Sequence, residues 1–127
     1  MARILLVNDE PDLMDVCQMA LEIAGHTVAT LTDASEALEL AKRFCPDLIG
    51  LDWVMPDTSG VEVLQQLKST PETRSIPVLV ISALESLEHE ARRLGAVGFL
   101  PKPFRAEELN RAVNHVLKAN TPAMQLG

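Results

Sequence analysis

Three short, almost continuous apolar runs end at polar residues, and segments with helical spacing separate them along the chain. The runs are Ile4–Val7, Leu48–Leu51 and Val78–Ile81, and Phe99–Leu100 is a shorter fourth one. Short apolar runs bounded by turn residues are typical of strands that are buried on both faces. Because such strands occur in parallel sheets that helices cover on both sides, the alternation predicts an α/β fold.

A fifth strand is expected at an edge of this sheet. Thr27–Leu31 alternates polar with apolar side chains, which is typical of a strand with one solvated face. We predict a flavodoxin-like, doubly wound fold with five parallel strands in the order 2-1-3-4-5 and five helices. The apolar residues expected to bury one face of the first helix, which Gly25 would end, are Leu13, Val16, Cys17, Ala20, Leu21 and Ala24.

Length and composition indicate one domain. The chain has 127 residues, of which 47% are hydrophobic, enough for one core and too few for two ordinary domains. We expect the domain to span residues 1–119 and residues 120–127, which lack periodicity, to form a flexible C-terminal tail. No apolar stretch approaches the roughly 20 residues of a membrane span. The prediction is a cytoplasmic protein that does not contact a membrane.

The net charge and the spacing of the two cysteines exclude some classes of function. The net charge of −7 argues against direct binding to nucleic acid, which requires a basic surface. Cys17 and Cys45 have neither metal-ligand nor CxxC spacing, so they are interpreted as reduced structural thiols.

Polar residues follow the predicted strands where each of them ends. Asp9 follows the first strand, Asp52 the third, Ser82 the fourth, and Lys102 comes shortly after the fifth. The carboxyl ends of parallel strands meet at one rim of a sheet, so these side chains are expected to lie together. Asp9 and Asp52, with a backbone carbonyl from the loop after the third strand, form an oxygen ligand set that suits Mg²⁺.

Each of these residues also has an ordinary structural explanation. Asp9 could cap the first helix, Lys102 could be a solvated loop lysine, and strands often end in a residue such as Ser82. Their combination is more specific than any one of them. A strand-end carboxylate, a divalent metal, a lysine and a hydroxyl at one rim are the groups needed for phosphoryl transfer to an aspartate.

The motifs resemble those of response-regulator receiver domains of two-component systems. The matching segments occur in the family's order and extend from residue 3 to about residue 118. They are Val7-Asn8-Asp9-Glu10-Pro11, Leu51-Asp52 with Met55-Pro56 and Gly60, Ser82-Ala83, and Lys102-Pro103-Phe104. The resemblance also implies a cis peptide bond between Lys102 and Pro103.

The resemblance assigns roles to individual residues. Asp52 would be the phospho-acceptor, Lys102 the lysine that contacts the phosphoryl group, and Ser82 the switch hydroxyl. Phe99 would be the switch aromatic. The implied cofactor is Mg²⁺, or Mn²⁺ in its place, and its implied ligands are Asp9, Asp52, the backbone carbonyl of Val54 and, through a water molecule, Asn8.

The function implied is that of a phospho-accepting signalling domain in a phosphorelay, with self-phosphorylation and self-dephosphorylation chemistry only, and not an enzyme. Its partners would be a sensor histidine kinase or phosphotransfer protein and a downstream effector protein or output domain. Phosphorylation of Asp52 would shift the surface formed by the fourth helix, fifth strand and fifth helix, which could also form a homodimer. The chain could be a stand-alone receiver or a fragment of a longer regulator.

Asn8 departs from the family pattern, which usually has two acidic residues after the first strand. An amide can still hold a metal-bound water, but the site loses one negative charge, so weaker Mg²⁺ binding is expected. One alternative is therefore a pseudo-receiver that binds its partners without phosphorylation. A haloacid-dehalogenase-like phosphohydrolase is a second alternative, although its nucleophile would be on the first strand with another Asp two residues later.

Overall fold

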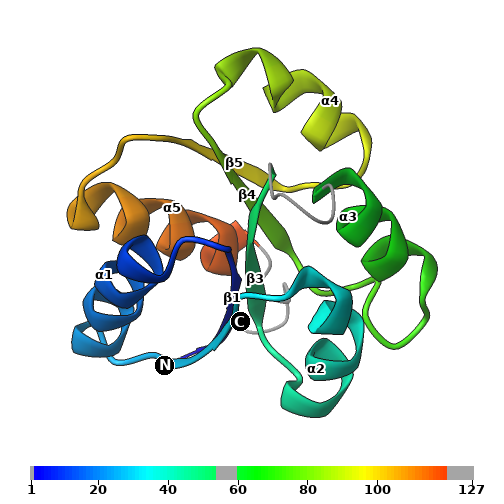
Figure 1. The fold of residues 1–127 in the computed structure, drawn as a ribbon, viewed down its shortest axis with the longest axis horizontal. Helices are drawn as coiled ribbons and strands as arrows, with labels where there is room; N and C mark the ends of the chain where they lie inside the picture. The colour runs from blue at the N-terminus through cyan, green and yellow to red at the C-terminus, as the bar shows by residue number, and fades with distance from the viewer. Residues whose placement is uncertain (1, 54–59, 120–127) are drawn as a thin grey trace, which may run out of the picture.

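The computed structural model describes residues 2–53 and 60–119, in which strands and helices alternate (Figure 1). The strands are β1 (Arg3–Val7), β2 (Thr27–Leu31), β3 (Leu48–Asp52), β4 (Val78–Ser82) and β5 (Gly98–Pro101). The helices are α1 (Pro11–Ile23), α2 (Ala37–Phe44), α3 (Gly60–Ser69), α4 (Glu88–Arg93) and α5 (Ala106–Ala119). Short 3-10 turns, Ala34–Glu36 and Glu85–Leu87, precede α2 and α4.

The strands form one parallel sheet in the order β2-β1-β3-β4-β5. This order confirms the predicted flavodoxin-like topology and places β2 at an edge. Val7, the last residue of β1, pairs with Leu31 of β2 and with Leu51 of β3. All five strands therefore end at the same rim of the sheet.

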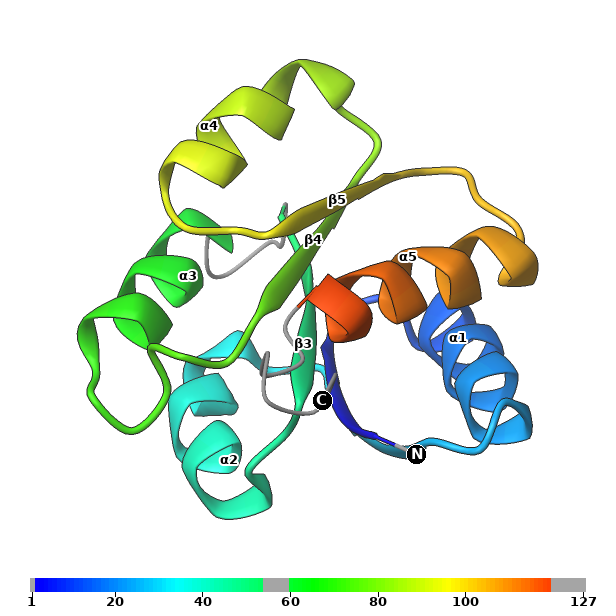
Figure 2. The same cartoon turned by 180° about the vertical axis from the view of Figure 1, so that it is seen from behind.

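Helices cover both faces of the sheet. Figure 1 and Figure 2 show α1 and α5 on one face and α2, α3 and α4 on the other. Successive residues of a strand point to opposite faces, so each strand contributes to both layers. In β1, Ile4 and Leu6 join the hydrophobic cluster under α1 and α5, and Leu5 and Val7 join the one under α2, α3 and α4.

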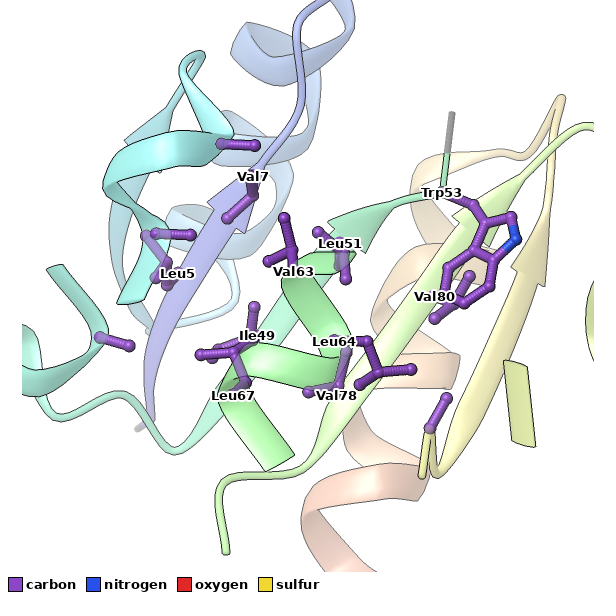
Figure 3. Close-up of a cluster of buried hydrophobic side chains, with 14 of the residues drawn as sticks. Leu5, Val7, Ile49, Leu51, Trp53, Val63, Leu64, Leu67, Val78 and Val80 are labelled. Carbon is purple, nitrogen blue, oxygen red and sulfur yellow. The ribbon is translucent and has the colours of Figure 1, made fainter. Parts of the chain in front are cut away.

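The cluster under α2, α3 and α4 is shown in Figure 3. Val63, Leu64 and Leu67 of α3 lie against the side chains of the central strands and are almost completely buried. Trp53, which directly follows β3, is also buried and belongs to this cluster. The core therefore extends to the rim where the polar strand ends lie.

The prediction for the first helix was partly wrong. Val16 was expected in the core, but it is 61% exposed, and Ala24 is exposed as well. The buried residues of α1 are Met14, Cys17 and Leu21, which are three and four positions apart and form one stripe. Val16 lies outside this stripe and faces solvent.

Helix ends show why several polar and glycine residues occur where they do. Gly25 and Gly95, which follow α1 and α4, have φ angles of 101° and 115°, a conformation that favours glycine. Asp33 accepts a hydrogen bond from the Ser35 backbone N–H at 3.0 Å and so caps the turn before α2. None of the helices within residues 2–53 and 60–119 is long and apolar enough to cross a membrane.

Candidate functional site

The sheet register brings together the residues that follow β1 and end β3. Val7 pairs with Leu51, so Asn8 and Asp52 leave the sheet side by side. Asn8 and Asp52 are both buried, and Asp9 is half-buried. An acidic residue at the end of a central strand, covered from solvent, is unusual because a buried carboxylate requires polar or charged partners.

Asp52 has a cationic partner from the far end of the chain. The Nζ atom of Lys102 lies 3.4 Å from Asp52 Oδ2 and 2.7 Å from Glu10 Oε1. Asp52 is 3% exposed, so its ion pair with Lys102 is shielded from solvent on the carboxylate side. The structure thus brings Asp52 and Lys102 together as the sequence predicted, although 49 residues separate them in the chain.

The carboxylates keep Lys102 charged. Burial by itself would lower the pKa of the Lys102 ammonium, but the hydrogen bond to Glu10 and the charge of Asp52 outweigh that effect. The pKa of Lys102 therefore lies above its ordinary value. Lys102 carries a full positive charge at neutral pH beside the carboxylate of Asp52.

Ser82 ends β4 and is joined to the lysine segment by the backbone. The Ser82 carbonyl accepts a hydrogen bond from the Lys102 N–H at 2.9 Å, and Ser82 pairs with Pro101 in the sheet register. The Ser82 hydroxyl oxygen, which is buried, accepts a hydrogen bond from the Leu84 N–H at 3.0 Å. The peptide bond between Lys102 and Pro103 is cis, as the resemblance implied.

Asn8 has a local role at the start of α1. Its Oδ1 accepts a hydrogen bond from the Glu10 N–H at 2.7 Å, an Asx turn that fixes the backbone between β1 and the helix. The role suggested for Asn8, holding a metal-bound water, stays a prediction. Asn8 Oδ1 has a second lone pair, which can accept a hydrogen bond from a metal-bound water.

Gly60 allows the chain to pass close behind Asp52. A Cβ atom on Gly60 would lie 2.7 Å from both the Cα and the carbonyl oxygen of Trp53, and 2.9 Å from the Asp52 carbonyl oxygen. The Gly60 N–H donates a hydrogen bond to that Trp53 carbonyl at 2.9 Å, and the Trp53 N–H donates to Ile81 at 3.0 Å. The backbone that directly follows Asp52 is thereby fixed to α3 and β4.

Phe99 lies on β5 at some distance along the strand from the rim. It pairs with Val80, is half-buried, and packs against the cluster of Figure 3. Phe99 also lines a groove of about 390 Å³ between α4, β5 and α5, together with Arg92, Arg111 and His115. Val54, predicted to supply a metal-binding carbonyl, is outside the described residues.

The donor groups at the rim suit a hard divalent cation. Asp9 and Asp52 provide two carboxylates, and Mg²⁺ commonly takes one or two carboxylates and keeps several waters. Within the described ranges, 2–53 and 60–119, no group of three or more His, Cys, Asp or Glu side chains is arranged as a metal site. Two carboxylates, with water completing the coordination, are a donor set that Mg²⁺ accepts.

Glu10 was not assigned a role from the sequence, although its contact with Lys102 is the shortest ion pair of the site. It appeared only as part of the motif after the first strand. The available signal was its position directly after Asp9, which places a third acidic residue at the same rim as Lys102.

Comparison with known proteins identifies the class. Residues 4–114 match the family described as the response regulator receiver domain. Chemotaxis response regulator CheY4 of Vibrio cholerae has a similar structure, with a TM-score of 0.86 and 30% identity over 91% of this chain and 98% of that one. The chain therefore belongs to the response regulator receiver domain family, whose members are signalling domains of two-component systems.

Longer proteins contain similar domains. The chain is 36% identical over 120 residues to the "DNA-binding dual master transcriptional regulator RpaA" of Synechocystis sp., covering 93% of this chain and 50% of that protein. It is 37% identical over 122 residues to "Response regulator MprA" of Mycobacterium leprae, covering 94% and 53%. The chain thus spans about half the length of these two relatives.

Proposed function

We propose that this chain is a phospho-accepting receiver domain and that Asp52 is its phospho-acceptor. The observation that carries the proposal is the ion pair between the buried Asp52 carboxylate and the Lys102 ammonium at the carboxyl ends of the strands. This is the edge at which open α/β sheets bind their ligands. Membership of the receiver family supports the assignment of this pair of residues to phosphoryl transfer.

The reaction follows from the groups at the rim. An oxygen of Asp52 attacks the phosphorus of the donor and forms a new P–O bond, while the bond to the donor's leaving group breaks and its electron pair leaves with that group. Lys102 keeps its proton and stabilises the negative charge of the phosphoryl oxygens. Mg²⁺ or Mn²⁺, held by Asp9, Asp52 and the Val54 carbonyl, would supply further charge neutralisation when bound.

The proposed output is a change in the surface of α4, β5 and α5. Ser82 and Lys102 are joined by a backbone hydrogen bond, so a shift of Ser82 toward a phosphoryl group on Asp52 would also affect the end of β5. Phe99 lies on the same strand and lines the groove on this surface. Ser82 and Phe99 are the residues proposed to couple phosphorylation to the groove.

The proposed partners follow from this chemistry. A sensor histidine kinase or a phosphotransfer protein would supply the phosphoryl group. The α4, β5 and α5 surface would contact an effector protein, an output domain or a second copy of the chain. We assign the receiver to residues 1–119 and the tail to residues 120–127.

Incubation with acetyl phosphate and Mg²⁺ tests this proposal. We expect the intact mass to increase by one phosphoryl group, because Asp52 can attack a small acyl phosphate without a kinase. Borohydride reduction, which converts an aspartyl phosphate to homoserine, followed by peptide mapping should place the modification at Asp52. An unchanged mass in a folded sample would instead support a pseudo-receiver that binds its partners without phosphorylation.

Trp53 offers a spectroscopic test of the metal site. It is the only tryptophan, it directly follows Asp52, and its ring is buried in the core beside the rim. We expect its emission to change when Mg²⁺ is added, and again when beryllofluoride is added as a phosphoryl mimic. The Asp9→Asn variant should require more Mg²⁺ for the same change. A flat titration up to roughly tens of millimolar Mg²⁺, well above ordinary cellular sites, would contradict a metal site here.

A further inference from the structure

Lys102 is shared unequally between two carboxylates. Its Nζ atom lies 2.7 Å from Glu10 Oε1 and 3.4 Å from Asp52 Oδ2. Hydrogen bonds between an ammonium and a carboxylate are usually 2.7–2.9 Å long, so the contact with Glu10 has the geometry of a strong bond and the contact with Asp52 does not. In this arrangement the ammonium is held mainly by Glu10.

The backbone fixes Glu10 in the position that this contact needs. The Glu10 N–H donates to Asn8 Oδ1 at 2.7 Å, and the Glu10 carbonyl accepts from the Met14 N–H at 3.0 Å. Pro11, which begins α1, restricts the preceding residue to an extended conformation, and Glu10 has φ −102° and ψ 97°. These constraints come from both neighbouring elements and leave only the side chain of Glu10 to move.

The side chain of Glu10 is not used by the helix that it precedes. Glu10 is the N-cap residue of α1, yet its side chain makes no capping hydrogen bond. Its carboxylate is directed instead to Lys102, 92 residues further along the chain. The Glu10 side chain is 56% exposed and that of Lys102 is 20% exposed, so the contact can open without disturbing the core.

We propose that Glu10 is a positioning residue that acts as the nearer partner of the Lys102 ammonium in the unphosphorylated chain, leaves Lys102 only a long contact with Asp52, and thereby slows phosphoryl acceptance. The proposal rests on the proposed function of Asp52. During transfer from acetyl phosphate, Asp52 forms a bond to phosphorus, the bond from phosphorus to the acetate oxygen breaks, and acetate leaves with the electron pair. Lys102 stays protonated and exchanges the Glu10 carboxylate for a phosphoryl oxygen.

The strength of the contact between Glu10 and Lys102 sets the size of the expected change in the rate of phosphorylation. Partly exposed ion pairs contribute little to stability, so removing the contact should raise the rate of phosphorylation by only about 2- to 5-fold. Glu10→Gln removes the charge but nearly preserves the shape. Glu10→Asp keeps the charge and shortens the side chain by one methylene, so it should also weaken the 2.7 Å contact.

The experiment compares the rates of phosphorylation by acetyl phosphate at saturating Mg²⁺, followed by intact mass, for the wild-type chain and three variants. Glu10→Gln and Glu10→Asp should both be faster than wild type. Asp12→Asn, which removes an exposed charge in the first turn of α1, is the charge control and should match wild type. Melting temperatures of all four proteins verify that each is folded.

The outcomes separate this inference from the function on which it rests. If wild type accepts a phosphoryl group on Asp52 and Glu10→Gln is no faster, Glu10 does not restrain Lys102 and only the inference is overturned. A gain in Glu10→Gln and Asp12→Asn, without one in Glu10→Asp, would show an effect of net charge and would also overturn it. If wild type accepts no phosphoryl group, both the function and the inference fail.

Discussion

Replacing Asp52 by asparagine is expected to abolish the incorporation of a phosphoryl group from acetyl phosphate. The amide is a poor nucleophile compared with a carboxylate, and Asp9 and Glu10, which also lie at this rim, are more exposed than Asp52. The substitution keeps the size of the side chain, and Lys102 retains its ion pair with Glu10, so the domain should fold. Intact mass measured after incubation with acetyl phosphate and Mg²⁺ gives the result directly.

Asp15→Asn is the matched control for this substitution. Asp15 is exposed on α1 and undergoes the same chemical change, so this variant should be phosphorylated like wild type. Equal incorporation in Asp52→Asn and wild type would show that another residue accepts the phosphoryl group. That result would contradict the assignment of Asp52.

Replacing Gly60 by alanine is expected to produce the largest loss of stability among these substitutions. The added Cβ would lie 2.7 Å from backbone atoms of Trp53, which are held in turn by a hydrogen bond to Ile81. Because neither side of this contact is a movable side chain, we expect a loss of about 2–3 kcal/mol in the free energy of unfolding. The melting temperature should fall by roughly 6–12 °C, and phosphorylation of Asp52 should slow because the adjacent backbone has to shift.

Gly50→Ala tests whether the close backbone contact is the cause. Gly50 is also buried, but the obstacle to its Cβ is a methyl group of Leu6 at 2.9 Å, the end of a side chain that can change its conformation. The loss of stability should therefore be clearly smaller than for Gly60→Ala. Similar melting temperatures for the two variants would show that the backbone near Trp53 adapts, against our expectation.

Much of the fold could be predicted because parallel strands have a simple signature. The apolar runs around Leu5, Ile49 and Val80 had the right positions, and the observed strand order is the predicted one. Helical spacing alone does not show where α4 begins. Leu84 lies three residues before Leu87, as it would on one face of a helix, but α4 begins at Glu88 after a 3-10 turn and Leu84 is 52% exposed.

The exposed face of α1 shows what periodicity leaves undetermined. Apolar residues occur on more than one side of this helix, so two overlapping stripes fit helical spacing equally well. Packing against the sheet buries Met14, Cys17 and Leu21, while Val16, Met19 and Ile23 remain exposed. Sequence spacing alone cannot choose between these stripes.

The site was predictable where it depends on strand ends and unpredictable where it depends on side-chain geometry. Parallel pairing was sufficient to place Asp52 beside the first strand and near Lys102. The unequal sharing of Lys102 was not foreseen, because it depends on the direction of the Glu10 side chain and on the Asx turn made by Asn8. Neither feature produces a repeating pattern in the sequence from which it could be predicted.

The two hydrophobic clusters lie on opposite faces of the sheet, and the backbone of the sheet separates them. A change of side-chain volume in one cluster, such as at Leu64, can be accommodated only by neighbours in that cluster. Leu109, under α5, belongs to the other cluster and cannot compensate for it. During divergence of the sequence, the two halves of the core can therefore accumulate substitutions almost independently, and compensating pairs should be found within one cluster.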